Sequence, residues 1–311
     1  MSLMMWGSRQ WIPDTDVTGC SVCSVDFTLF LRRHHCRRCG NVICSSCSKS
    51  RMAVPPLHVA LVRICDPCEV VLSDHDAIAL ALCPGADVGL MRVYTTASMA
   101  MESYDAMAGY YDLWSSYERP HIEAALATLA ATEGEVVVEI GCGTGRAALS
   151  IARVVQHRGG RYFGIDLSSK MLEAASRRLT SATDIKLPSW SFVQGDATMP
   201  PLPVVQSAAD ALFLSFTLEL FDTPALPVVL ASCLAAMKPG GRIVTVSMAR
   251  SGGGLAVWLY EWMHAHYPRT VDCRPIDAAA LLACAGFTLV SVEQRSLCGL
   301  PIEVVLALAP G

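Results

Sequence analysis

The most specifically spaced residues of this sequence are eight cysteines within its first 68 positions, which form four Cys-x-x-Cys pairs. The pairs are Cys20/Cys23, Cys36/Cys39, Cys44/Cys47 and Cys65/Cys68. Each pair offers two thiolates on one tight turn, and a tetrahedral zinc ion takes two such turns. We therefore expect two closed, structural Cys₄ sites. Intact pairs can combine in three ways, and their spacing does not choose among these.

Composition limits the classes of protein to which the chain can belong. Its 311 residues predict two domains, and 52% hydrophobic against 17% charged residues predicts a large core. The net charge of −4 argues against a nucleic-acid partner. Residues 1–18 contain no apolar signal segment, and no apolar run is long enough for a membrane helix. We expect a cytoplasmic chain whose cysteines bind metal or stay reduced, with a disulfide framework as the less favoured alternative.

A basic segment, Arg32-Arg33-His34-His35-Cys36-Arg37, lies between the cysteine pairs. In an extended strand Arg33, His35 and Arg37 would share one face. Clustered guanidinium and imidazole donors suit an oxyanion with several oxygens, most naturally a phosphate monoester. The apolar segment 27–31 just before them should face outward in part, because so small a module has almost no core. Together these features predict a surface for anionic membranes, and the alternative is a solvated basic face.

Farther along the chain, Val136-Val137-Val138-Glu139-Ile140 predicts a buried parallel strand. Three alternating glycines follow it, and residues 146–153 continue as a helix. Such a strand, turn and helix form a nucleotide-type pocket at the carboxyl end of a sheet. A dinucleotide fingerprint would need its third glycine at Arg146, so the spacing does not fit NAD.

Strands and helices alternate through the rest of the chain. Further strands are predicted at 161–166, 190–197, 210–216 and 238–246, and helices at 169–179 and 224–237. Five β/α units predict a Rossmann-like, doubly wound α/β sheet. Asp166 ends the second strand, 25 residues beyond Gly141, where a carboxylate can accept both hydroxyl protons of a ribose.

Residues 11–68 resemble the FYVE zinc finger. The resemblance rests on Trp11-x-x-Asp14, on Arg32-Arg33-His34-His35-Cys36-Arg37-x-Cys39-Gly40 and on Arg63-Ile64-Cys65, where Ile64 replaces the usual valine. It implies a cross-brace with two zinc ions, one held by Cys20, Cys23, Cys44 and Cys47, the other by Cys36, Cys39, Cys65 and Cys68. A RING-type module is the alternative class, but it usually includes a histidine ligand, whereas eight cysteines complete both sites here.

The same resemblance implies a ligand and a membrane contact. The ligand is phosphatidylinositol 3-phosphate, held by Asp14, Arg32, Arg33, His34, His35, Arg37 and Arg63. The loop that inserts into the membrane would carry Leu29 and Phe30. The chain would then be peripheral on endosomal membranes.

Glu139-x-Gly141-x-Gly143-x-Gly145 resembles motif I of the class I S-adenosylmethionine-dependent methyltransferases. The resemblance implies S-adenosylmethionine as cofactor, with contacts from Glu139, Gly141, Gly143, Gly145, Asp166, Asp196, Ala197 and Ser215. The pattern Tyr104-Asp105-x-x-Ala108-x-x-Tyr111-Asp112 resembles the lid helix of methyltransferases akin to those of ubiquinone and menaquinone biosynthesis. It makes Tyr111 a further cofactor candidate.

Methyl transfer from a sulfonium needs alignment and exclusion of water, and a general base only if the acceptor must lose a proton. Glu219 and His264 are candidate bases, although each could equally be an ordinary surface or capping residue. The acceptor should meet the lid helix and the segment 252–276. The sequence does not identify the acceptor.

We expect a FYVE-type finger at 11–70, a linker at 71–97 and a class I methyltransferase domain at 98–310. The finger would recruit the enzyme to membranes carrying phosphatidylinositol 3-phosphate, where its acceptor is a lipid, a quinone or phenol, or a protein. The alternative is an adaptor whose second domain does not turn over. The intact glycine motif, Asp166 and Asp196 favour the enzyme.

Overall fold

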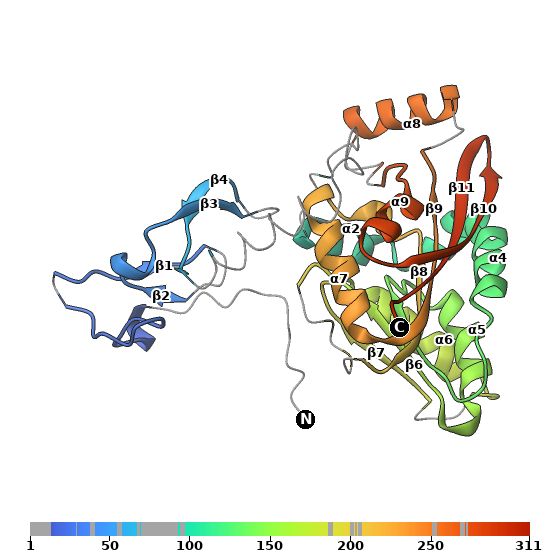
Figure 1. The fold of residues 1–311 in the computed structure, drawn as a ribbon, viewed down its shortest axis with the longest axis horizontal. Coiled ribbons are helices and arrows are strands. Elements are labelled where there is room, and N and C mark those ends of the chain that lie inside the picture. Colours follow the sequence, from blue (N-terminus) through green and yellow to red (C-terminus); the bar gives the residue numbers. More distant parts are fainter. Residues whose placement is uncertain are drawn as a thin grey trace. The chain divides into compact units, whose positions relative to one another are not determined.

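The computed structural model describes residues 14–28, 30–37, 41–54, 58–66, 69, 93, 97–185, 189–199, 202, 204, 207–250, 254–267, 271 and 273–311. The chain forms two compact units, Met1–Ala81 and Leu82–Gly311 (Figure 1). The expected linker at 71–97 falls almost wholly outside the described residues. None of the described helices has the length and apolar character needed to cross a membrane.

The first unit consists of short elements around a minimal core. Its elements are η1 (Asp14–Asp16), β1 (His34–His35), β2 (Val42–Ile43), η2 (Ser45–Cys47), β3 (Arg51–Val54) and β4 (His58–Arg63). Two antiparallel hairpins, β1–β2 and β3–β4, make up its sheets. Five cysteines and two isoleucines, Ile43 and Ile64, form the buried cluster. So little aliphatic surface would leave a unit of this size marginal without further cross-links.

The second unit is built on a seven-stranded sheet. Its strands are β5 (Val136–Ile140), β6 (Arg161–Asp166), β7 (Trp190–Gln194), β8 (Ala209–Ser215), β9 (Met237–Met248), β10 (Thr288–Leu297) and β11 (Leu300–Leu308). They lie in the order β10-β11-β9-β8-β5-β6-β7. The five strands from β9 to β7 are mutually parallel, as the sequence predicts, and β11 runs antiparallel between β9 and β10.

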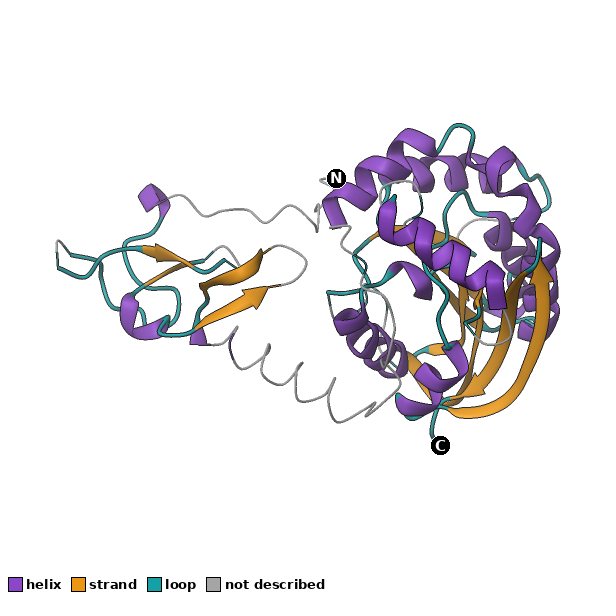
Figure 2. Cartoon of the chain, turned by 90° about the horizontal axis from the view of Figure 1, so that it is seen from above, coloured by secondary structure: helices purple, strands orange, loops and turns teal. Residues whose placement is uncertain are grey.

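Helices cover both faces of this sheet (Figure 2). They are α2 (Ala97–Met107), α3 (Tyr111–Trp114), α4 (Arg119–Leu129), α5 (Arg146–Val155), α6 (Ser169–Ser181), α7 (Leu226–Ala236), α8 (Gly254–His266) and α9 (Ala278–Cys284), with 3-10 turns η3 (Ser115–Glu118), η4 (His157–Gly159), η5 (Leu218–Leu220) and η6 (Thr223–Ala225). The expected single lid helix is divided into α2 and α3 by a turn at residues 108–110, which include Gly109.

Alternation along β5 divides the core into two layers. Val138 and Ile140 pack with α7 and α9 on one face, whereas Val137 packs with α4, α5 and α6 on the other. Because parallel strands share one direction, the carboxyl ends of β5, β6, β7 and β8 meet at one edge of the sheet. The side chains and turns at that edge therefore come from segments far apart in the sequence.

Phe213 on β8 offers a test of this packing, since its ring is fully buried in the layer against α4 and α5. We expect Phe213→Ala to lower the free energy of unfolding of the second unit by about 3–5 kcal/mol, because it leaves a cavity that the sheet cannot close. Urea unfolding followed by circular dichroism measures this. Val154→Ala, at an exposed position on α5, is the control and should change stability by less than about 0.5 kcal/mol.

Candidate functional site

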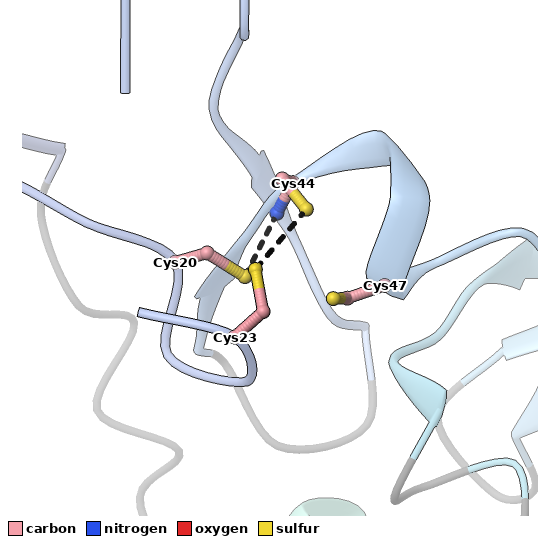
Figure 3. A group of neighbouring side chains, drawn as sticks. All are labelled: Cys20, Cys23, Cys44 and Cys47. Carbon is pink, nitrogen blue, oxygen red and sulfur yellow. Dashed lines mark hydrogen bonds between the residues drawn. The ribbon is translucent and has the colours of Figure 1, made fainter. Parts of the chain in front are cut away.

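Four cysteines of the first unit converge on one point. The sulfur atoms of Cys20, Cys23, Cys44 and Cys47 all lie within 4.8 Å of one another (Figure 3). The backbone N–H of Cys44 donates to the Cys20 sulfur at 3.3 Å. Burial raises the pKa of Cys20, but backbone N–H groups of Cys23, Cys44 and Val22 oppose this and lower that pKa to about 6. Four close sulfurs, one of them stabilised as a thiolate, fit a tetrahedral zinc ion.

The second and fourth pairs also approach each other. The backbone N–H of Cys65 donates to the Cys36 sulfur at 3.3 Å, and both residues are buried. Their partners Cys39 and Cys68 lie outside the described residues. The geometry thus favours one of the three possible ways to combine the four cysteine pairs into two metal sites. In this combination the first pair shares a site with the third. It is the combination that a cross-brace requires.

The basic segment divides into two groups, as alternation along a strand predicts. In the first group, His35 Nε2 lies 3.5 Å from Asp14 Oδ1. The Arg33 guanidinium donates to the Val17 carbonyl at 3.2 Å and lies 4.9 Å from the centre of the Phe27 ring. Arg37 Nη1 donates to the His35 carbonyl at 3.1 Å. These bonds fix the directions of the donors before any ligand arrives.

The second group surrounds His34. Burial lowers the pKa of His34, and the charges of Arg63, Arg51 and Arg32 lower it further. Arg63 Nη1 is held by the Ser48 carbonyl and hydroxyl, each at 3.0 Å. Arg51 pairs with Arg63 in the register of β3 and β4. Sequence spacing alone does not indicate Arg51, because only strand pairing brings it beside the motif.

The loop before this segment presents an aromatic ring to solvent. Phe30 is 99% exposed. The Thr28 hydroxyl accepts hydrogen bonds from the backbone N–H groups of Phe30 and Leu31, at 3.3 and 3.0 Å, and so fixes the loop from which Phe30 projects. Leu29 lies outside the described residues.

At the carboxyl edge of the second unit, Asp166 ties the glycine turn to the next helix. Its Oδ2 accepts from the Gly143 N–H at 2.8 Å, and its Oδ1 accepts from the Ser168 N–H at 2.9 Å. Burial raises the pKa of Asp166 to about 6, although these N–H donors favour the ionised form.

The three glycines of the turn meet different surroundings. A Cβ on Gly141 would lie 2.5 Å from Thr217 Oγ1, and one on Gly145 would lie 2.9 Å from the Ala175 Cβ. These two are close-packed. Gly143 has φ of +51°, and a Cβ there would meet nothing within 4 Å. Open space beside an N–H held by Asp166 fits a ligand that lies against the turn.

Glu139 ends beneath the turn rather than on its surface. The carboxyl group is buried, and Oε2 accepts from the Tyr162 hydroxyl at 2.5 Å. Burial raises the pKa of Glu139 to about 8, so the carboxyl is neutral at pH 7. Its observed contact is with β6, through Tyr162.

The lid segments are clamped to this edge by two aspartates. Asp105 accepts from the Ser168 hydroxyl at 2.5 Å and from the Lys170 N–H at 3.1 Å, which anchors α2 to the start of α6. Asp112 accepts from the Thr144 hydroxyl at 2.5 Å. It also forms ion pairs with Arg146 and Arg178, which fix α3 beside the first turn of α5.

In the sequence, Asp105 and Asp112 stand out only as parts of the Tyr-Asp pattern, and no role is expected of them there. Tyr111 itself packs edge-to-face on Tyr104, with ring centres 6.2 Å apart. The signal that could have identified the clamps was an aspartate directly after each tyrosine.

The other expected cofactor contacts lie at the same edge. Asp196 Oδ1 accepts from the N–H and the hydroxyl of Thr198, at 2.9 and 2.6 Å, and thereby shapes the turn after β7. Ala197 is buried in the same turn. Ser215 ends β8, where its carbonyl accepts from the Thr217 hydroxyl at 2.9 Å. The structure therefore gathers residues from four strands around one turn.

The two candidate bases occupy different places. Glu219 is fully buried in η5, and its Oε1 accepts from the Met248 N–H at 3.2 Å. Its Oε2 has no hydrogen-bond partner in the described part of the chain. Burial raises the pKa of Glu219 to about 8, so the carboxyl is protonated at neutral pH. His264 is buried in α8, and its Nδ1 bonds to the Val271 carbonyl at 2.8 Å.

Comparison with known proteins assigns a family to each unit. Residues 10–74 match the family model "FYVE zinc finger", and residues 137–241 match the model "Methyltransferase domain". The finger is 42% identical over 77 residues to the mouse FYVE, RhoGEF and PH domain-containing protein 6. It is 50% identical over 61 residues to the human zinc finger FYVE domain-containing protein 26. These alignments cover 24% and 19% of this chain but only 6% and 2% of those relatives.

Solved structures agree with the assignment of the second unit. One similar chain belongs to the complex of the Haloferax volcanii Trm112 methyltransferase activator with a methyltransferase. It has a TM-score of 0.52, 20% identity, and coverage of 67% of this chain and 98% of that one. A Bacillus halodurans protein described as a methyltransferase gives a TM-score of 0.51 and 14% identity, covering 61% and 99%. At these identities the likeness establishes the fold.

The sheet order and the matched family give the second unit the fold of the class I methyltransferases. The chain thus carries a FYVE zinc finger at residues 10–74 and a methyltransferase domain at residues 137–241. The expectations of a zinc-binding cysteine module and an α/β methyltransferase fold are thereby confirmed.

The cysteine geometry predicts that the first unit depends on metal. We expect two zinc ions per purified chain, and Cys44→Ser should release at least one of them and unfold the first unit, because the remaining core is too small to fold alone. Metal analysis and circular dichroism measure this. Cys298→Ser, at an exposed cysteine of the second unit, is the control and should retain both ions. One ion or none in the wild type would contradict the double site.

Proposed function

We propose that this chain transfers a methyl group from S-adenosylmethionine to a membrane-associated acceptor, and that its finger recruits it to bilayers containing phosphatidylinositol 3-phosphate. The observation that carries the catalytic half is the open space at Gly143, framed by the Asp166 carboxylate. A half-buried carboxylate beside a glycine turn can accept paired hydroxyl protons, as a ribose would offer them. The other cofactor residues would be those expected from the sequence.

Electrostatics at this edge supports a cationic ligand. Glu139 and Glu219 are buried and Asp166 is half-buried, and desolvation raises the pKa of each. A raised pKa means that negative charge is poorly solvated there, so a nearby positive charge lowers the free energy of the ionised forms. The cofactor, when bound, supplies such a charge in its sulfonium, together with the activated methyl group.

The chain's own residues would then orient the reactants and exclude water. Asp105 and Asp112 hold α2 and α3 across the turn, so these segments can cover a ligand lying at Gly143. Glu219 is protonated at neutral pH and could accept a proton only after losing its own. We therefore propose alignment as the main contribution of the protein, with Glu219 and His264 as secondary candidates for proton transfer.

The finger supports the membrane half of the proposal. The finger carries two directed groups of basic side chains, and the exposed Phe30 lies in the loop that precedes the basic segment in the sequence. Guanidinium and imidazole donors fixed in this way suit a phosphate monoester, and an exposed ring suits insertion among acyl chains. The proposed lipid contacts are those expected from the sequence, with Arg51 added. Two zinc ions would hold the module together.

Tethering to one membrane would explain why a FYVE finger and a methyltransferase domain occur in the same chain. A finger and an acceptor on one surface raise the effective concentration of each for the other by about 10²–10⁴. A lipid, a quinone or phenol, or a membrane-bound protein meets that condition. An adaptor without turnover is the rival function.

Asp166 provides the test of cofactor binding. Asp166→Ala should weaken S-adenosylmethionine binding by about 1.5–3 kcal/mol, because a charge-assisted hydrogen bond to a hydroxyl is lost. Calorimetry measures the affinity. Asp184→Ala, which breaks only an exposed ion pair with Arg153, is the matched control. Equal affinities of Asp166→Ala and the wild type would remove Asp166 from the site.

The same carboxyl predicts a pH dependence of cofactor affinity. Ionised Asp166 is the form that accepts hydroxyl protons, and its pKa is about 6. Affinity should be full above that pH and should fall as the pH drops through 6. A titration from pH 7.5 to 5.5 checks this, and an affinity that rises toward low pH would contradict it.

Arg33 provides the test of recruitment. Turnover of one acceptor should be equal for Arg33→Ala and wild type in detergent, and lower for the variant on liposomes with phosphatidylinositol 3-phosphate. Zinc content verifies that the variant finger is folded. Arg119→Ala, at an exposed arginine of α4, should behave as wild type in both formats. Equal rates of Arg33→Ala and wild type on the liposomes would contradict tethering.

A further inference from the structure

Glu118, where η3 meets α4, lies at the carboxyl edge of the sheet. The direction of α4 shows this. Arg242 Nε donates to the Leu129 carbonyl at 2.6 Å, which fixes the end of α4 beside Arg242 of β9. The helix packs over the residues of β9 that follow, as far as Met248. Its first residues therefore lie near the end of that strand.

A second contact fixes the start of α4 at the same level. Arg295 Nε donates to His121 Nδ1 at 3.2 Å, and Figure 1 shows α4 beside the β10–β11 hairpin. Arg295 is opposite Ile302 on β11, and Ile302 is opposite Met248 at the end of β9. Glu118 precedes His121 by about one helical turn. It is therefore placed at or beyond the end of β9.

The Glu219 carboxyl occupies this edge as well. Its Oε1 accepts from the Met248 N–H at 3.2 Å, whereas its Oε2 is buried and has no hydrogen-bond partner among the described residues. Burial raises the pKa of Glu219, and the negative charge of Glu118 raises it further. Buried polar atoms are normally hydrogen-bonded, so an orphaned carboxyl oxygen points to a ligand that donates to it.

Two arginines near the carboxyl pair do not neutralise it. Burial raises the pKa of Glu118 to about 7, against the charge of Arg146, which is itself paired with Asp112. Arg274 donates to the Glu219 backbone carbonyl at 3.1 Å, and its charge leaves the pKa of the carboxyl at about 8. The Glu118 carboxyl is half-buried and does not cap its helix. Two such groups ionise together only when a further positive charge arrives.

The ligand that meets both needs must be a cation and a hydrogen-bond donor. An alcohol donates a proton but brings no charge, and a sulfonium brings charge but has no proton to donate. A divalent metal ion takes about six oxygen ligands, and in the part of the chain that the structure describes no third ligating side chain joins the two carboxyls. An ammonium group supplies three donors and one positive charge.

We propose that Glu118 and Glu219 form the acceptor subsite of the methyltransferase domain, and that the acceptor is an amine that enters as an ammonium ion. The inference rests on the proposed function and narrows its acceptor, because a quinone or a phenol does not carry this charge. Glu118 acts as a specificity residue and Glu219 as the proton acceptor.

The two carboxyls would bind the acceptor and then activate it. The positive charge of the ammonium favours ionisation of both. The ammonium gives one proton to the Glu219 carboxylate, which frees the lone pair of nitrogen. The nitrogen–carbon bond then forms while the carbon–sulfur bond of the methyl donor breaks, and the electron pair of that bond stays on sulfur. The product leaves as a methylated ammonium, and Glu219 returns its proton to water.

Three probes of equal chain length test the subsite without cofactor. They are octylamine, octanol and octyltrimethylammonium, titrated calorimetrically into the full zinc-bound chain. Octylamine should bind about tenfold or more tightly than either reference probe, because it alone combines charge with N–H donors. Its binding at pH 7 should release about one proton, since it favours the ionised carboxyls. Titrations in two buffers of different ionisation enthalpy measure this release.

Glu118→Gln removes the charge and keeps the size of the side chain. It should weaken octylamine binding about tenfold or more, lower the proton release, and leave the affinity for S-adenosylmethionine unchanged. Glu219→Gln should also weaken octylamine binding, and circular dichroism verifies that both variants fold. Glu123→Gln, at an exposed carboxyl of the same helix, is the matched control and should bind octylamine like the wild type. With labelled S-adenosylmethionine, mass spectrometry should find the methyl group on the nitrogen of octylamine.

The proposal is overturned if a reference probe binds as tightly as octylamine, or if Glu118→Gln binds octylamine like the wild type. It is also overturned if Glu118→Gln weakens S-adenosylmethionine binding by a similar factor, since the pair would then serve the sulfonium. The two possible failures are distinguishable. A wild type that binds octylamine but no S-adenosylmethionine contradicts the proposed function and leaves an amine site. A wild type that binds S-adenosylmethionine but no octylamine overturns the amine site alone.

Discussion

The pair of hydrogen bonds from the Gly143 and Ser168 N–H groups to the Asp166 carboxylate holds the carboxyl edge of the second unit's sheet together. It joins the turn after β5, the end of β6 and the start of α6. Asp105 bonds to the Ser168 hydroxyl and so adds the lid to the same network. Hydrogen bonds to a charged group contribute about 1.5–3 kcal/mol each, so this carboxylate is one of the groups that organise the edge, together with Asp112.

The same arrangement lowers the stability of the ligand-free protein at neutral pH. The pKa of Asp166 is raised to about 6 by burial. A carboxyl whose pKa is higher in the folded than in the unfolded state favours folding at low pH, and that contribution is lost as the pH rises through 6. At neutral pH the ionised carboxylate therefore destabilises the fold slightly. Binding of a partly cationic ligand at this edge would offset this cost, so ligand binding there would stabilise the domain.

The first unit is also organised by atoms that converge on one point. The constraint that it must meet is different, because its hydrophobic core is very small. Its buried cluster contains five cysteines and two isoleucines, so apolar burial cannot supply the stability that the second unit obtains from its sheet. Four sulfur atoms within 4.8 Å of one another form a site for a metal ion, which can stabilise the unit in place of a larger hydrophobic core. Some of its basic side chains are tied into the unit, because Arg63 donates to the buried Ser48 and Arg33 donates to the Val17 carbonyl.

The sequence by itself determined the elements whose signal is local. The valines before Glu139 predicted β5, the Cys-x-x-Cys spacing predicted the zinc module, and the position of Asp166 after its strand predicted a place at the carboxyl edge of the sheet. Tertiary structure alone decided which distant groups meet. Asp112 reaches Arg146 and Arg178, Arg51 stands beside Arg63, and the β10–β11 hairpin pairs with β9. Hydrophobic periodicity reports whether a face is apolar, whereas the partner of that face depends on packing between segments that sequence spacing does not encode.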